Sequence, residues 1–153
     1  MKPSGKLADL ELLKPLSPAE LEKLERLLLV KDYRDGHTFW QEGAKIHDDR
    51  RAIFFILQGK VAVSTEREEQ TYIPVARTLK AGEIFGLISF LQGDVYSATC
   101  RTDGPVCAAS LARTEYDSLF TTDVPLAASI TYAISRQLAR DVRLCNARLV
   151  KEI

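Results

Sequence analysis

Between residues 31 and 112 the sequence consists of short apolar segments separated by turn residues. The segments read HTFWQEG, AIFFILQGKVAVST, QTYIPVARTLKAGEIFG, SATCRT and VCAASLA, and the glycines among them are Gly36, Gly43, Gly59, Gly82, Gly93 and Gly104. The charged stretch EREEQ at 66–70 is typical of a hairpin tip. Strand-like runs spaced by about 8 to 12 residues indicate an antiparallel β-sandwich, roll or barrel.

A short amphipathic helix is predicted before this region, in LSPAELEKLERLLLV. Ser17 is placed to cap it, Pro18 suits its first turn, and Glu20 completes a capping box. Leucines then recur on one face as far as Leu28, so the helix packs on a larger body. Residues 1–15 read as a polar lead-in.

Helical periodicity returns after residue 112. RTEYDSLFTT predicts one short helix with Thr114 as its cap, and Pro125 opens the long stretch PLAASITYAISRQLARDVRLCNARLVKEI. A helix of that length spans about 40 Å, which is more than a small β-roll needs to cover itself.

The long helix carries a stripe of mostly apolar residues at spacings of three and four. The predicted seam consists of Ile134, Leu138, Asp141, Cys145 and Leu149. Such a stripe is typical of a dimer contact, and we expect a homodimer along residues 125–150. The alternative is that the helix packs only on its own roll.

Composition agrees with one globular domain. Of the 153 residues, 46% are hydrophobic and 27% are charged, so a core can form without disulfides or metals. We expect a single α+β domain over 16–153, with its roll at about 31–112 and its C-terminal helices at 114–153. The 21 basic and 21 acidic residues balance, which argues against binding to nucleic acid or to an anionic membrane through overall charge.

The sequence offers little material for catalysis or metal binding. It has two histidines, His37 and His47, and three cysteines without metal-ligand spacing, and no GxSxG motif is present. We therefore expect no enzyme, no metal and no bound cofactor. The beginning of the chain has no apolar signal region, and no run approaches the roughly 18 to 20 apolar residues of a membrane span, so a cytoplasmic protein is predicted.

One stretch has the frame of a phosphate-binding cassette: GEIFGLISFLQGDVYSATC at 82–100. Gly86 allows a close approach of the backbone, LISFL at 87–91 predicts a short helix, and Ser97 follows a polar loop. Backbone N–H groups at the start of that helix are suited to an anion such as a phosphate.

The chain resembles the cyclic nucleotide-binding domain family of the bacterial Crp/Fnr catabolite-activator type. The resemblance covers about residues 16 to 150 and rests on RDGHTFWQEG, FFILQGKVAV, LKAGEIFG, YSATCRT and CAASLARTEYDSLF. It implies an antiparallel β-roll, a double-stranded β-helix like a jelly roll, with one leading helix and two trailing helices. The last of these is long and forms a dimer.

The resemblance also identifies ligand positions. A family cassette carries a Glu for the ribose hydroxyl and an Arg for the cyclic phosphate, and these positions are Leu87 and Tyr96 here. The surrounding frame is retained in Phe85, Gly86, Ile88, Ser97 and Ala98. On the long helix, the base-pocket positions correspond to Arg140, Cys145 and Asn146. Both charged contacts are absent, so we expect that cAMP is not bound in the usual way.

Three states of the pocket stay open at this stage: plugged by Leu87, Ile88 and Phe90, retuned for a different nucleotide or a more apolar effector, or weakly binding for ordinary cyclic nucleotides. The predicted function is a stand-alone regulatory or sensor module with a small-molecule effector or a protein partner. A ligand-free dimeric scaffold is one alternative. The other is the sensory half of a Crp/Fnr transcription factor, without the DNA-binding domain that would follow Ile153.

Overall fold

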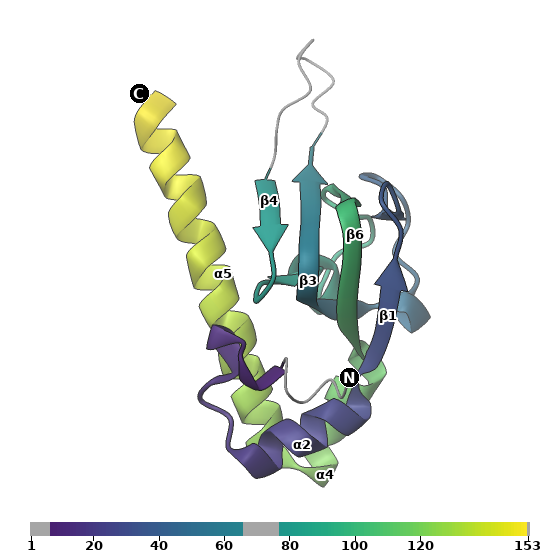
Figure 1. Cartoon of the computed structure of the whole chain (residues 1–153), viewed down its shortest axis with the longest axis vertical. Coiled ribbons are helices and arrows are strands. Elements are labelled where there is room, and N and C mark those ends of the chain that lie inside the picture. Colours follow the sequence, from purple (N-terminus) through teal and green to yellow (C-terminus); the bar gives the residue numbers. More distant parts are fainter. Residues whose placement is uncertain (1–6, 66–76, 153) are drawn as a thin grey trace.

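The computed structural model describes residues 7–65 and 77–152, with side chains as far as residue 147. Its elements are, in chain order, η1 (Glu11–Leu13), α2 (Pro18–Leu27), β1 (Leu29–Tyr33), β2 (Thr38–Trp40), η2 (Asp48–Arg50), β3 (Ala52–Ser64), β4 (Arg77–Lys80), β5 (Ile84–Phe85), α3 (Leu87–Leu91), β6 (Thr99–Ala112), α4 (Arg113–Thr122) and α5 (Val124–Glu152). The strands form one body, α5 runs beside it, and α2 and α4 lie at one end (Figure 1). The predicted hairpin tip at 66–70 lies outside the described residues.

Two long strands, β3 and β6, form the centre of the six-stranded sheet. They pair antiparallel from Ala52 opposite Ala112 to Ser64 opposite Thr99. β1 and β2 add to β6, and β4 and β5 add to β3. All of these pairings are antiparallel, so the predicted β-roll with a leading helix and trailing helices is confirmed.

The runs SATCRT and VCAASLA belong to one continuous strand, β6, where the sequence predicted two. The pairing of β3 with β6 shifts register on either side of Gln58, which marks a bulge and not a chain reversal. Gly59 sits at this bulge with φ +94°, and a Cβ there would lie 2.3 Å from the carbonyl oxygen of Pro105. Only glycine fits at this close approach of two backbones.

The leading helix α2 begins as predicted. The backbone N–H of Glu20 donates to Ser17 Oγ, and the backbone N–H of Ser17 donates to Glu20 Oε1, both at 3.1 Å. The helix ends at Leu27, and Leu29 already starts β1, two residues before the predicted strand region. Pairing of β1 with β6, from Leu29 opposite Ser110, satisfies the backbone there and ends the helix.

Two hydrophobic clusters make up the core. One fills the interior of the roll and includes Ile56, Val61 and Phe85. The other lies between the roll and the helices. The segment before α2 contributes to this second cluster through Leu7, Leu10, Leu12, Leu13 and Leu16, all of which are buried. The expectation of a polar lead-in over 1–15 is therefore wrong from residue 7 onward, because its leucines pack inward.

The trailing helices follow the predicted pattern with two corrections. The N-cap position of α4 is Ala112, which makes no side-chain capping bond, and Thr114 lies inside the first turn. The first half of α5 packs into the helix-side core, where Ile134 is 3% exposed. Ile134 therefore faces its own chain and not a second copy. Leu138 also packs against this core.

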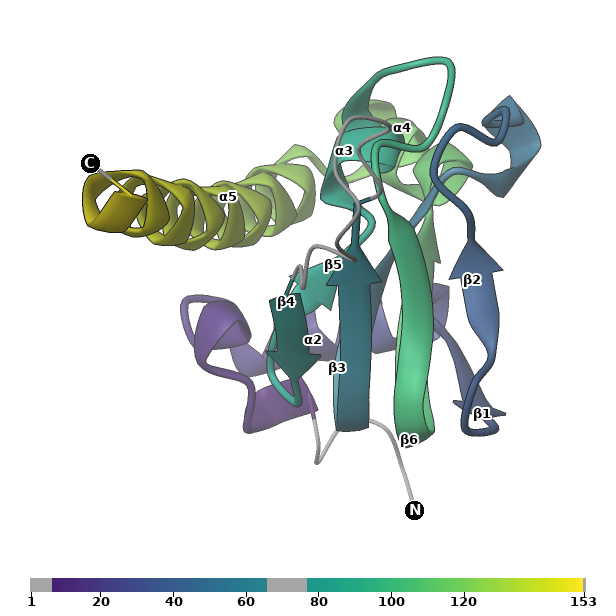
Figure 2. The ribbon, with the colours of Figure 1, turned by 90° about the horizontal axis from the view of Figure 1, so that it is seen from above.

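The second half of α5 leaves the sheet. Figures 1 and 2 show its C-terminal end standing away from the strands. Side chains from Val142 to Ala147 are exposed, among them the predicted seam residue Cys145. The side chain of Leu149 lies outside those described. In the described part of the chain, no helix has both the length and the apolar character that a membrane crossing requires.

Candidate functional site

The cassette stretch folds into β5, a left-handed glycine and the short helix α3. Gly86 has φ +85° and stands at the N-cap of α3. A Cβ at this position would lie 3.0 Å from both the carbonyl oxygen of Ala52 and the ring of Trp40. Both the backbone angle and the tight surroundings therefore require glycine at the turn.

A cavity of about 130 Å³ opens beside this turn. It lies between the roll and α5, and most of its walls are apolar. It is lined by Trp40, Val63, Arg77, Leu79, Ile84, Phe85, Gly86, Leu87, Ile88, Ser89, Tyr96, Ser97, Ala98, Cys100 and Asp141. Because this space remains open, Leu87, Ile88 and Tyr96 do not fill the pocket completely.

The structure brings together seven of the predicted pocket residues and separates two others. The seven are Phe85, Gly86, Leu87, Ile88, Tyr96, Ser97 and Ala98. Arg140 lines a different groove, near Lys80 and Glu83. Asn146 is exposed on the second half of α5 and does not line the cavity.

The two substituted cassette positions make apolar contacts. Leu87 is 4% exposed and belongs to the helix-side core as well as to the cavity wall. Tyr96 stacks on Trp40, with ring centroids 5.0 Å apart and an angle of 10° between the planes. Neither side chain supplies the carboxylate or the guanidinium that the resemblance associates with these positions. Phe90, predicted as a plug, is a fully buried residue of α3 and does not line the cavity.

Cys100 forms part of the apolar floor. Burial raises the pKa of its thiol to about 12, and a hydrogen bond from the Trp40 side chain offsets this only in part. A thiol needs its thiolate form to react as a nucleophile. Cys100 therefore serves as a neutral, apolar wall at physiological pH.

An ion pair that the sequence did not reveal closes one side of the cavity. Arg77 on β4 donates through Nη1 to Oδ1 of Asp141 on α5. Its Nη2 lies 3.4 Å from Oε1 of Glu83. The other oxygen of Glu83 accepts the backbone N–H of Lys80 at 2.7 Å. Asp141, expected on a dimer seam, thus turns toward its own roll.

Gln137 strengthens the same junction one helical turn away. It is fully buried, and its Oε1 accepts the backbone N–H of Ile84 at 3.3 Å. Its Nε2 donates to Asp141 Oδ1 at 2.9 Å. α5 is therefore bonded to both β4 and β5 at the edge of the cavity. The signal in the sequence was the presence of Gln137 and Asp141 among the apolar residues of the long helix.

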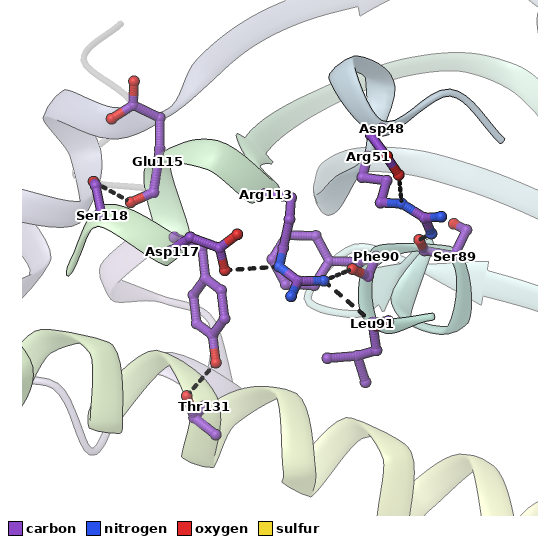
Figure 3. A network of polar contacts seen from close by, with 11 residues as sticks. Asp48, Arg51, Ser89, Phe90, Leu91, Arg113, Glu115, Asp117, Ser118 and Thr131 are labelled. Atoms are coloured by element: carbon purple, nitrogen blue, oxygen red, sulfur yellow. Dashed lines mark hydrogen bonds and ion pairs between the residues drawn. The ribbon is translucent and has the colours of Figure 1, made fainter. Parts of the chain in front are cut away.

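The far end of α3 is held by two arginines (Figure 3). Arg51 donates to the carbonyl oxygens of Ser89 and Gly93. Arg113 donates to the carbonyl oxygens of Phe90, at 2.6 Å, and Leu91, at 3.4 Å. Cations favour the C-terminal end of a helix, where carbonyl groups lack partners within the helix. The cassette helix is thus fixed at the end away from the cavity.

Known proteins share this architecture. The family model for the cyclic nucleotide-binding domain matches residues 30–123. A cyclic nucleotide-binding domain from Methylobacillus flagellatus has a TM-score of 0.87 at 20% identity, over 98% of this chain and 84% of that chain. The N-terminal domain of a transcriptional regulator from Streptomyces coelicolor has a TM-score of 0.71 at 16% identity, over 89% of this chain and 94% of that chain.

A regulator with a different effector is also similar. The c-di-GMP-responsive global regulator of Xanthomonas campestris has a TM-score of 0.69 at 20% identity, over 82% of this chain and 59% of that chain. No curated protein matches the chain in sequence. Structural likeness at these identities supports the fold, and the family model covers more than half of the chain, including β1 to β6. The chain belongs to the cyclic nucleotide-binding domain family.

Proposed function

We propose that this chain is a regulatory module that binds a small effector in the cavity between the roll and α5, without the usual cassette contacts to cAMP. The main support is that the cavity persists, although Leu87 and Tyr96 occupy the positions at which the family holds ribose and phosphate. Both side chains are engaged elsewhere, Leu87 in the core and Tyr96 on Trp40.

Size and lining favour a compact effector. An apolar cavity of about 150 Å³ accepts benzene, whereas pockets for drug-sized ligands measure about 300 to 1,000 Å³. At about 130 Å³ the present cavity belongs to the smaller class. A ligand that fits it has a small apolar body, because Trp40, Leu79 and Phe85 form its floor.

An ordinary cyclic nucleotide would bind poorly here. Each charge-assisted hydrogen bond contributes about 1.5 to 3 kcal/mol. Loss of two such bonds, at positions 87 and 96, weakens binding by about a hundred- to ten-thousandfold. The family resemblance alone therefore does not make cAMP the effector.

We further propose that the second half of α5 transmits the signal and contacts a second copy of the chain. Val142, which is 57% exposed, and the exposed Cys145 are three residues apart and share one face of a helix that extends away from the sheet. An apolar surface on a projecting helix is stabilised when the same helix of a partner covers it. The output is regulatory and not catalytic, as in the transcriptional regulators that share the fold.

A ligand screen with a cavity-filling variant tests effector binding. Trp40 is the single tryptophan and lines the cavity, so its fluorescence reports on occupancy. We expect a compact organic ligand to change this fluorescence saturably and to raise the melting temperature, since ligand at a hundred times Kd adds about 2.7 kcal/mol. Val63→Phe, which fills the cavity, should abolish both effects.

Val95→Phe is the matched control, because Val95 is 53% exposed and does not line the cavity. It should bind as the wild type does. Micromolar binding of cAMP would contradict the proposal. An absence of any ligand effect across the screen would favour the ligand-free scaffold instead.

Sedimentation tests the dimer. Val142→Glu should convert a dimer into a monomer, whereas Ser135→Glu, on the exposed side of the packed half, should leave it intact. Leu138 is a less suitable site because it also packs against the core, so a charge there would confound dissociation with unfolding. A monomeric wild type would overturn this part of the proposal.

A further inference from the structure

The ion pair beside the cavity identifies the chemistry of the effector more closely. We propose that the effector carries a compact oxyanion, a carboxylate or a phosphate, which replaces the Asp141 carboxylate on Arg77 and so releases α5 from the roll. This inference rests on the proposed function, because it concerns an effector in the same cavity.

Arg77 is the group that would receive the oxyanion. Among the described residues that line the cavity, Arg77 and Asp141 are the only charged ones. The Arg77 side chain is 21% exposed. A guanidinium that is largely removed from water requires an anionic partner, and its planar donors suit a carboxylate or a phosphate.

The present partner of Arg77 belongs to α5, the helix that we propose is released. Asp141 lies on α5, and among the described residues it is the one through which α5 lines the cavity. Glu83, in contrast, lies in the roll beside β5 and accepts the backbone N–H of Lys80 at 2.7 Å. An anion in the cavity therefore competes with a helix for Arg77, while Glu83 stays in place.

The charges around Arg77 require that an effector anion replaces Asp141 and does not bind beside it. Arg77 already contacts two carboxylates, Asp141 and Glu83. A third anion beside the same guanidinium would experience strong repulsion, because like charges a few ångströms apart interact strongly in a partly desolvated site. Of the two carboxylates, Asp141 is the one whose departure makes room inside the cavity.

The departure of Asp141 would loosen α5 at its contact with the roll. Gln137 donates to Asp141 and accepts from the backbone of Ile84, so the two α5 side chains act on one junction. Beyond Asp141 the side chains of α5 are exposed as far as residue 147. Binding would thus be coupled to the part of α5 proposed to contact a second copy.

Small aromatic anions serve as probes. Benzoate and phenyl phosphate combine a compact apolar body with each of the two oxyanions, and benzyl alcohol is the neutral counterpart. Trp40 fluorescence is titrated with each probe in the wild type, in Asp141→Asn and in the double variant Arg77→Gln/Asp141→Asn. The double variant avoids leaving a carboxylate without its cation, which would complicate Arg77→Gln alone.

We expect Asp141→Asn to tighten binding of the anions by about tenfold, because the internal competitor is gone. The double variant should lose this gain and bind them at least about tenfold more weakly than Asp141→Asn. The affinity for benzyl alcohol should be the same in all three proteins. Hydrogen exchange of amides 137–147 in the wild type should accelerate when the anions bind.

Two results would overturn the inference and differ in what they mean for the proposed function. Equal affinity for benzyl alcohol and the anions in all three proteins would leave an effector cavity without oxyanion exchange. Absence of any fluorescence change with all probes would reject the exchange, and the Val63→Phe screen would then decide separately whether the cavity binds an effector. A larger gain in affinity on Asp141→Asn for phenyl phosphate than for benzoate, or the reverse, would support the exchange and identify the preferred oxyanion.

Discussion

The two ends of the short helix α3 are held in different ways. Its first end follows Gly86 without a side-chain cap and borders the cavity. At its other end, Arg51 and Arg113 donate to backbone carbonyl oxygens of α3 and of the loop that follows (Figure 3). The first end depends on a residue without a side chain, Gly86, and the other end on the long cationic side chains of Arg51 and Arg113.

The arginines on the two sides of α3 differ in what they bind. Arg51 and Arg113 donate to backbone carbonyl groups, which stay in place for as long as the chain is folded, and each also pairs with a carboxylate three or four residues away, Asp48 or Asp117. Arg77 binds the side-chain carboxylates of Glu83 and Asp141, and Asp141 lies on another element. The same residue type therefore fixes the cassette helix on one side and forms an exchangeable contact on the other.

The largest expected effect comes from adding a side chain at the first end. Gly86→Ala should lower the free energy of unfolding by about 3 kcal/mol, as measured by urea denaturation. A left-handed backbone angle costs a residue with a Cβ about 1 to 2 kcal/mol. Crowding against Ala52 and Trp40, each with an atom 3.0 Å from the new Cβ, adds about 1 to 2 kcal/mol.

Gly43→Ala separates these two contributions. Gly43 has φ +83°, but nothing lies within 4 Å of its ideal Cβ position. Its substitution should therefore cost only the backbone term of about 1 to 2 kcal/mol. Equal losses for the two variants would show that the contacts of Gly86 do not contribute to the requirement for glycine.

Local patterns in the sequence predicted much of the frame. The Ser17–Glu20 capping box, most of the turn glycines and the helix after residue 124 depend on neighbours within a few positions, and these are present, whereas Gly104 lies inside β6 and not in a turn. The lead-in was misjudged because its leucines have no obvious partner within the segment. They are buried by α5 and the roll, which only the folded chain brings near.

The charged part of the site could not be predicted in the same way. Arg77 and Asp141 are 64 positions apart, and no periodicity links them. The contacts of Arg51 and Arg113 to α3 go to backbone oxygens, so no complementary residue type marks them. Asp141 was assigned to a dimer seam because helical spacing identifies a face but not what covers it.

A smaller effect is expected at the fixed end of α3. Arg51→Met keeps much of the apolar stem and removes the bonds to Ser89 and Gly93, so stability should fall by about 2 kcal/mol. The ion pair with Asp48 is lost too, but Asp48 is exposed and the pair contributes little. Arg50→Met, at an exposed neighbouring position, should change it by less than about 0.5 kcal/mol. If the two variants are equally stable in urea, Arg51 does not hold the helix.

The smallest expected effect is a loss of stability at high pH, which tests whether the cavity floor around Cys100 excludes water. The pKa of the Cys100 thiol is about 12 in the folded protein, above its ordinary value of 9.0, because the group is buried. Below pH 9 the thiol is protonated in both the folded and the unfolded chain, and its contribution to stability is constant. As the pH rises from 9 toward 12, only the unfolded chain loses this proton, so the folded state loses stability.

Between pH 8 and pH 10 the wild type should therefore lose about 1.4 kcal/mol more than Cys100→Ala, as measured by urea unfolding at each pH. Cys145→Ala is the matched control, because Cys145 is exposed on α5, and it should keep the wild-type dependence. If the free energy of unfolding of Cys100→Ala falls with pH as steeply as that of the wild type, Cys100 does not carry the pH dependence. Its thiol is then not shielded from water, and water reaches the floor of the cavity. A hydrated floor would remove the reason to expect an apolar body in the effector.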